Sequence, residues 1–218
     1  VDLCPRLAVV ANDVALSNPN GASRPELVRA RVAKGAVALL PLVRSREVVV
    51  ESLELDGVDV ALEMLPEGRG NWVLEPSGGG STPSTGREDP NRAGAPIRLG
   101  GSVVIVDAKL TWRPQGGGET AVGIPRLEIA PATEGRYAWK GTLDADGVRW
   151  AIDATTGDPM VYARDRMPLD LDIRVAGGGV TSTVKGRVER RGSGPAIVAD
   201  ASLGWSEGSE WLARLAPR

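Results

Sequence analysis

The sequence predicts a mainly β protein, built as one long, curved antiparallel meander that forms an open groove and carries one or two short helices. Apolar and polar residues alternate with a period of two in segment after segment. The 218 residues include 28 Gly and 16 Pro, which suits many strands separated by turns. Most connections are short. Such alternation gives each strand one apolar and one solvated face, as is typical of antiparallel sheets.

The first segments combine a strand with a helix signal. Residues 7–17 alternate as a strand, and Asn-Pro-Asn-Gly at 18–21 is a strong turn signal. Ser23 and Glu26 stand three positions apart, as the N-cap and acidic residue of a capping box do. This spacing predicts a short helix near residues 24–30.

Strand spacing returns at residues 31–40, and Pro41 is expected to end that strand because it cannot donate to a ladder. Residues 48–55 and 58–64 then form a predicted hairpin around Asp-Gly at 56–57.

The stretch Gly-Arg-Gly-Asn-Trp at 68–72 follows the predicted hairpin as a structural turn. Gly68 and Gly70 supply turn conformations. Asn71 then leads to Trp72, whose indole is expected to close the end of the hairpin.

Residues 76–96 have no aliphatic or aromatic side chain larger than Ala. Such a segment cannot bury enough apolar area to offset its ordering entropy. We interpret it as a mobile, disordered insertion, with phosphorylation or glycosylation as a less favoured use. Alternation resumes unchanged afterwards, so residues 1–75 and 97–218 are expected to belong to one continuous domain.

The second half has the clearer alternation, over residues 104–112, 127–129, 137–143, 148–154, 169–175, 180–188 and 197–203. Residues 209–215 place Trp211, Leu212 and Leu215 at helical spacing and predict the start of a helix.

Composition excludes several classes of function. Charge is nearly balanced, with 26 basic and 28 acidic residues and no basic stripe, so nucleic-acid binding is not expected. There is no His, and the single Cys4 builds neither a disulfide nor a thiolate metal site. No nucleophile elbow or phosphate-binding loop is present. We therefore expect no enzyme activity, no cofactor and no metal.

Two acidic motifs are better explained by structure than by chemistry. Asp-Ala-Asp-Gly at 144–147 resembles the opening of a calcium loop, but it lacks the final Glu ligand and lies between strands, so a hairpin turn is expected. Asp170 and Asp172 share a strand face with Arg174 and are interpreted as a solvated edge. Gly177-Gly178-Gly179 reads as a hairpin loop, since no helix follows it.

No stretch approaches the roughly 20 apolar residues of a spanning helix, and residues 1–20 lack the regions of a signal peptide. The chain starts within an apparent strand and stops within an apparent helix. We expect it to be a fragment of a longer protein, with targeting information outside it.

Several stretches resemble the N-terminal region of the AsmA-like proteins of Gram-negative bacteria. They are Val-Ala-Leu-Ser-Asn-Pro at 14–19, Leu-Leu-Pro-Leu at 39–42, the segment 53–63, and above all Gly-Arg-Gly-Asn-Trp at 68–72. Residues 168–172, Gly186 and 211–215 resemble a later segment of the family. The resemblance implies a periplasmic β groove, anchored in the inner membrane by an N-terminal helix that these residues lack. It also implies lipid transfer and a role in outer-membrane lipid homeostasis and assembly, with possible envelope protein partners.

A sheet with one apolar face needs a cover, and the two short helical stretches are too small to cover nine or ten strands. A curved sheet would then hold an acyl chain. We expect contacts from a set of residues in phase with one another: Leu53, Leu55, Val60, Leu62, Val104, Val106, Leu110, Leu127, Ile129, Trp150, Ile152, Leu171 and Ile173. In the plainer alternative the sheet closes on itself and these side chains are core.

The six Trp residues, without any Phe, leave a further alternative open. Exposed Trp on a sheet suits a groove rim or a membrane surface, and it also suits stacking on sugar rings. A carbohydrate-binding module is thus a second hypothesis, and an assembly scaffold without lipid is a third.

Overall fold

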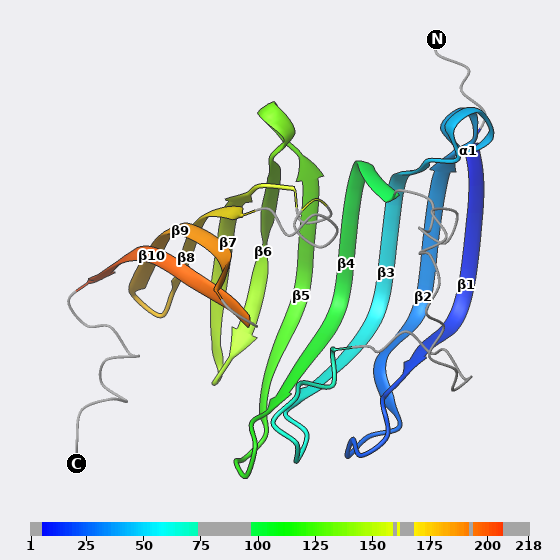
Figure 1. Cartoon of the computed structure of the whole chain (residues 1–218). Coiled ribbons are helices and arrows are strands. Elements are labelled where there is room, and N and C mark those ends of the chain that lie inside the picture. The colour runs from blue at the N-terminus through cyan, green and yellow to red at the C-terminus, as the bar shows by residue number, and fades with distance from the viewer. Residues whose placement is uncertain (1–5, 74–96, 159–160, 162–167, 192–193, 207–218) are drawn as a thin grey trace, which may run out of the picture.

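The computed structural model describes residues 6–73, 97–158, 161, 168–191 and 194–206 (Figure 1). These residues form one ten-stranded sheet whose strands lie side by side in sequence order, from β1 to β10. The strands are β1 Arg6–Ser17, β2 Glu26–Ala38, β3 Val48–Glu63, β4 Ile97–Arg113, β5 Thr120–Pro131, β6 Tyr137–Ala145, β7 Val148–Thr156, β8 Leu169–Gly177, β9 Val180–Arg191 and β10 Gly194–Trp205. The helical elements are α1 Leu39–Ser45 and the 3-10 turn η2 Thr133–Gly135. The mainly β prediction is confirmed.

One pair of neighbours departs from the predicted antiparallel meander. β3 and β4 are parallel, while every other neighbouring pair in the sheet is antiparallel. A parallel pair needs a connection of a dozen or more residues, and residues 64–96 supply it. The predicted long segment at 76–96 therefore falls within the only connection that has to bring the chain back along the described sheet.

Bulges cross the middle of the first strands. Asp13 in β1, Gly57 in β3 and Asp107 in β4 all have positive φ, at 51°, 63° and 54°. The register of β5 against β6 also shifts between Gly123 and Arg126. One extra residue in a strand reverses the face that later residues show. The apolar positions of β3 accordingly change from odd numbers before Gly57 to even numbers after it.

The expected hairpin at residues 56–57 is therefore wrong, since β3 runs through this position as one strand. A two-residue hairpin turn with Asp-Gly requires positive φ at both residues. Only Gly57 has it, which bends the strand without reversing it.

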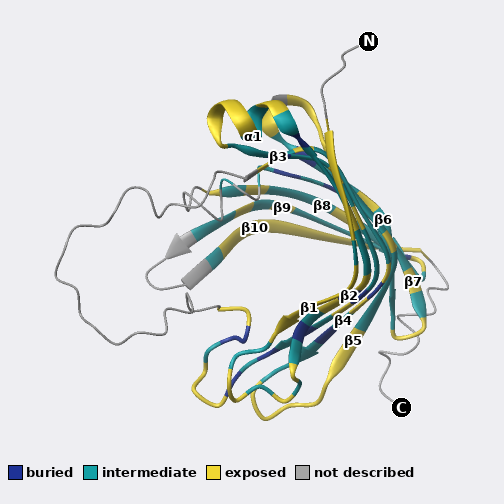
Figure 2. Cartoon of the chain, turned by 90° about the vertical axis from the view of Figure 1, so that its right-hand side faces the viewer, coloured by how far each residue is buried: buried dark blue, intermediate teal, exposed yellow. Residues whose placement is uncertain are grey.

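The sheet is bent into an open trough, C-shaped in cross-section (Figure 2). Leu55 and Val60 lie on either side of the Gly57 bulge, yet both pack against the same small core of Ala30, Val58 and Ala108. Side chains on the two sides of a bend approach each other only on its inner side. The face that carries these residues is therefore the concave face.

Two expectations about helices need correction. The predicted helix near residues 24–30 is replaced by strand β2, which begins at Glu26, and Ser23 donates to the Glu63 carboxylate instead of capping a helix. Strand pairing on both sides outweighs a cap that would be worth about 1 kcal/mol. Pro41 does not end a strand either; it lies in the first turn of α1, where a missing N–H is tolerated.

The predicted turns between the later strands are confirmed. Asp146 and Gly147 join β6 to β7 with positive φ at both residues, and Gly178 and Gly179 do the same between β8 and β9. The insertion at 76–96, the helix at 209–215 and Cys4 lie outside the described residues.

Candidate functional site

The concave face carries rows of apolar side chains that cross the whole sheet. Partners opposite each other in neighbouring strands share a face, so the register defines each row. One row consists of Val9, Gly35, Leu53, Val103, Ile129, Trp139, Ala154, Ile173, Val184 and Ala201. The next consists of Ala11, Ala33, Leu55, Ile105, Leu127, Gly141, Ile152, Val175, Ser182 and Leu203. Neither row contains a charge.

The opposite face has the contrary character. Its row between these two consists of Val10, Lys34, Glu54, Val104, Glu128, Lys140, Asp153, Arg174, Thr183 and Ser202, six of them charged. Lys34 pairs with Glu54 at 2.9 Å, and this hydrogen bond raises the pKa of Lys34. We call this side of the sheet the convex face. It is solvated and held by ion pairs, so it needs no cover.

The acidic residues Asp144, Asp170 and Asp172 also lie on the convex face. Asp170 is opposite Arg187 and Asp172 is opposite Lys185, with an ion pair in each case. Asp144 accepts two hydrogen bonds from Arg149, and this contact lowers the pKa of the Asp144 carboxyl. These carboxylates are charge partners within the sheet.

The register brings most of the predicted contact residues to one face. The residues on the concave face are Leu53, Leu55, Val60, Leu62, Leu110, Leu127, Ile129, Trp150, Ile152, Leu171 and Ile173. All of them are half-buried. Within the described part of the chain, no second sheet or helix layer lies over them (Figure 2). The alternative in which the sheet closes on itself is excluded for the described strands, since β1 and β10 stand at opposite ends of the strand order.

The prediction that Val104 and Val106 share the apolar face is wrong, because both lie on the convex face. Val104 lies between Glu54 and Glu128, and Val106 lies between Asp56 and Arg126. The bulge at Asp107 reverses the phase of β4, so the residues before it that share a face with Leu110 have odd numbers. The concave residues missed by the sequence reasoning include Val103, Ile105 and Trp139, and, in other strands, Val9, Val175, Val184 and Leu203.

Tryptophans gather at one end of the concave face. Trp112 is opposite Leu62, while Trp150 lies opposite Gly177 in a row that ends at Trp205. The Trp72 and Trp112 rings meet with centroids 5.5 Å apart at 46°. Trp72 and Trp205 are exposed. We call this the Asn71 end of the strands, and the opposite end, where α1 lies, the α1 end.

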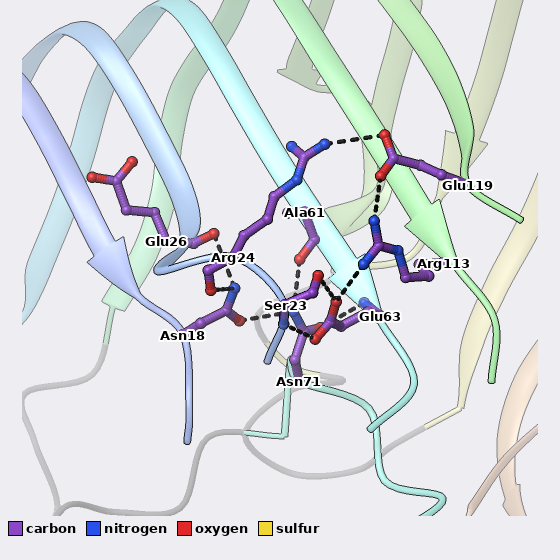
Figure 3. Close-up of polar contacts among 9 residues, drawn as sticks. All are labelled: Asn18, Ser23, Arg24, Glu26, Ala61, Glu63, Asn71, Arg113 and Glu119. Atoms are coloured by element: carbon purple, nitrogen blue, oxygen red, sulfur yellow. Dashed lines mark hydrogen bonds and ion pairs between the residues drawn. The ribbon is translucent and has the colours of Figure 1, made fainter. Parts of the chain in front are cut away.

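A hydrogen-bond network ties the strands together at the Asn71 end (Figure 3). Asn71 is fully buried. Its amide nitrogen donates to Ala61 O at 2.7 Å and to Asn18 Oδ1 at 2.8 Å, and its Oδ1 accepts from the Glu63 N–H at 3.0 Å. Asn18 in turn donates to the carbonyls of Arg24 and Glu26. The Asn71 and Asn18 amides together thus link β3 to the start of β2 and to the residue that follows β1.

Charged groups extend this network to β4 and β5. The buried Glu63 carboxylate accepts from Ser23, and Arg113 approaches it at 4.0 Å. Glu119 accepts from both Arg24 and Arg113, each at 3.0 Å. A surface hollow of about 500 Å³ beside Ser23, Glu63 and Arg113 contains both charge signs and no apolar row. We interpret these hydrogen bonds and ion pairs as contacts that stabilise this end of the sheet.

The Gly-Arg-Gly-Asn-Trp turn is explained by the same network. Gly68 has a φ of 74°, which favours glycine. A Cβ at Gly70 would collide with the Trp72 ring, which lies against it. The two glycines therefore allow a tight loop that delivers Asn71 inward and Trp72 toward Trp112. The structure places Gly68, Gly70, Asn71 and Trp72 in one tight turn, as predicted. The expectation that Trp72 closes the end of a hairpin is wrong, because residues 48–63 form one strand and the exposed Trp72 ring meets Trp112. The partners of Asn71 had no signal in the sequence.

Comparison with known protein families supports the resemblance noted in the sequence. Residues 1–78 match the model of the AsmA family. By this match residues 1–78 are similar to the AsmA family, while the resemblance of residues 168–172, Gly186 and 211–215 stays a prediction. The matched AsmA-like segment contains β1, β2, α1, β3 and the Asn71 turn, so the network of Figure 3 lies mostly within it.

The other comparisons add no relative. No curated protein and no solved structure matches the chain. Among the helices of its described residues, none has the length and apolar character needed to cross a membrane.

Proposed function

We propose that the concave face binds the acyl chains of lipids and that this AsmA-like protein holds or conducts lipid without catalysing a reaction. The proposal includes a role in outer-membrane lipid homeostasis and assembly, with the protein in the periplasm. An inner-membrane anchor outside residues 1–218 and envelope protein partners belong to the same proposal.

The observation that carries the proposal is the pair of uncharged rows across ten strands. Strands lie about 4.8 Å apart, so each row runs for roughly 40 Å. One leaflet of hydrocarbon is about 15 Å thick, half of a bilayer core. The concave face is therefore long enough to hold a complete acyl chain along a row.

The chemistry of these rows favours the hydrocarbon over the headgroup. Each buried methylene contributes about 0.8 kcal/mol, so a chain can be held by apolar contact alone. Ser182 is the only side chain in the two rows with a hydroxyl, and the rows hold no charged residue to select a headgroup. A site of this kind accepts different lipids and lets them slide.

The two faces of the sheet allow a matched test. Val60→Asn with Leu62→Asn places two amides on the concave face, and Val104→Asn with Val106→Asn places the same number on the convex face. Two unpartnered amides facing a bound chain should weaken fatty-acid binding at least about tenfold. We expect that loss, and a loss of copurified lipid by mass spectrometry, only in the concave variant. Equal lipid in both variants, with both folded by circular dichroism, would contradict the proposal.

The tryptophans at the Asn71 end favour one alternative, binding of carbohydrate. Trp150 faces the concave side and its ring lies over Gly177, which leaves a flat aromatic surface. For a sugar-binding module, retention on immobilised polysaccharide would be lost in Trp150→Ala while lipid content stayed the same. The remaining alternative, a scaffold for outer-membrane proteins, requires a protein partner and purified material that contains no lipid.

A further inference from the structure

The α1 end of the sheet has an exposed apolar tip. Val43 in α1 is 72% exposed and Leu40 is 42% exposed. The concave face continues up to this helix in the row Leu7, Val37, Val50 and Leu99. Figure 2 shows α1 projecting at the ends of the first strands. The concave apolar row and the exposed Leu40 and Val43 thus lie at the same end of the first strands.

Two arginines stand next to this tip. Arg44 lies in the last turn of α1 and Arg46 directly follows the helix, and both are exposed. Across the described residues, neither forms an ion pair. The other described arginines at this end of β1–β4 are neutralised, because Arg6 pairs with Glu51 and Arg98 pairs with Glu47. Four arginines against two glutamates leave two positive charges beside Leu40 and Val43.

The backbone at Arg46 gives an independent reason to look for a function. Arg46 is the C-cap of α1 and has φ 53° and ψ 30°, the left-handed conformation. Glycine is the residue that usually occupies such a position at a helix end. A long cationic side chain is held there despite the less favourable backbone. Strained positions of this kind are more often kept where the side chain has a task.

We propose that α1, with Arg44 and Arg46, docks on the surface of an anionic lipid bilayer. An interfacial helix of this type buries apolar side chains at the headgroup boundary while basic residues contact anionic headgroups. Leu40 and Val43 are the apolar contacts, and the two arginines supply the charge complementarity. Docking aligns the α1 end of the concave face with the bilayer. This interaction goes beyond acyl-chain binding, since it concerns a different surface and a different part of the lipid.

The contact should be weak and dependent on charge. A seven-residue helix is only about 10 Å long, so little area is buried. A basic residue near an anionic surface contributes roughly a fivefold gain in partitioning. In salt solution this attraction falls off over about one Debye length, which shortens as the salt concentration rises. We therefore expect reversible binding that decreases with ionic strength.

The test is flotation of the 218-residue chain with vesicles of phosphatidylcholine alone and with an equimolar mixture of phosphatidylcholine and phosphatidylglycerol. The wild-type protein should float preferentially with the mixture. Arg44→Gln with Arg46→Gln should lower partitioning into the mixture about 25-fold. Lys109→Gln is the matched control, since it removes an exposed charge in β4 away from α1, and should have little effect.

Arg46→Gly separates docking from folding. Glycine relieves the left-handed backbone, so the thermal midpoint should rise or stay the same, while partitioning falls about fivefold. Equal loss in Arg46→Gly and Lys109→Gln, or no preference of the wild-type protein for anionic vesicles, would overturn the docking proposal.

Fatty-acid binding measured in parallel keeps the two proposals apart. The arginine variants should retain it. Val60→Asn with Leu62→Asn should lose it and still float with anionic vesicles. Loss of flotation in that concave variant alone, with the arginine variants unaffected, would assign vesicle binding to the trough and overturn docking through α1.

Discussion

The two ends of the first strands are held in opposite ways. At the Asn71 end, a fully buried amide and a buried carboxylate link β1, β2, β3 and the adjoining loops. At the α1 end, the helix has no buried residue and its contacts leave Leu40 and Val43 facing outward. The sheet is one continuous structure, but in β1, β2 and β3 the network of buried polar groups described here lies at the Asn71 end and locks it.

This difference shows how an open sheet with few buried side chains is kept in register. The described core is small, and its only fully buried large side chains are Leu65 and Asn71, both at the locked end. Hydrogen bonds in such a site specify one arrangement, because any other leaves buried groups unpaired. The opposite end is left available for contact with other molecules.

Removing the central amide should have the largest effect. Asn71→Ala leaves the Glu63 N–H and the Ala61 carbonyl without their side-chain partner in a buried site. We expect a loss of about 3 kcal/mol in the free energy of unfolding, measured by urea denaturation. Asn20→Ala, in the exposed loop between β1 and β2, is the control and should change stability by less than about 0.5 kcal/mol. Equal effects would mean that the network does not lock this end.

The boundary between the two ends should be the next most sensitive. Gly57→Val forces a β-branched residue into φ 63°, and its Cβ would lie 2.9 Å from the Cβ of Arg31. We expect a loss of about 2 kcal/mol in the free energy of unfolding. Gly118→Val, where a Cβ meets nothing within 4 Å, is the matched control. A stable Gly57→Val protein would show that the bend does not depend on this bulge.

A smaller effect is expected at the α1 end, at Tyr137. Its hydroxyl donates a part-buried hydrogen bond to Leu99 O at 2.8 Å. Tyr137→Phe should cost about 1 kcal/mol at neutral pH, as measured by urea denaturation.

The same variant makes a prediction about pH. Burial, followed by the charge of Asp158, raises the pKa of Tyr137 above its ordinary value of 10.0. The resulting stabilisation is fully present below pH 10.0 and is lost as the pH rises from there through the raised pKa. The wild-type protein should therefore lose stability over this range, and Tyr137→Phe should lose less. If the wild-type protein and Tyr137→Phe lost the same stability above pH 10.0, the Tyr137 hydroxyl would not have the role assigned to it.

The alternation of residues was enough to predict the sheet and most of its strands. It was not enough to fix the face of every residue. Residues 103–106 are all aliphatic, so the sequence fits either choice of inward-facing residues. The bulge at Asp107 places Val103 and Ile105 on the same face as Leu110. The Asp-Gly pair at 56–57 correctly indicated a positive φ. A two-residue hairpin turn needs positive φ at both residues, whereas here only Gly57 has it, and the strand forms a bulge.

The locked end was less predictable. Gly68 and Gly70 marked a tight loop, whereas the contacts of Asn71 with Asn18 and of Glu63 with Ser23 span 53 and 40 residues of sequence. Such distant side-chain partners have no local periodicity. The capping-box spacing of Ser23 and Glu26 indicated a helix where the structure has strand β2, because the Ser23 hydroxyl donates a hydrogen bond to the Glu63 carboxylate in β3.

The parallel arrangement of β3 and β4 has a practical consequence. A tight hairpin turn requires a set number of residues between two antiparallel strands. The long connection between two parallel strands has no such set length. Each doubling of such a connection costs only about 0.6 kcal/mol in closure entropy. The span between residues 74 and 96 is therefore the place where foreign sequence, such as a reporter or an affinity tag, should be accepted without disturbing the ladders on either side.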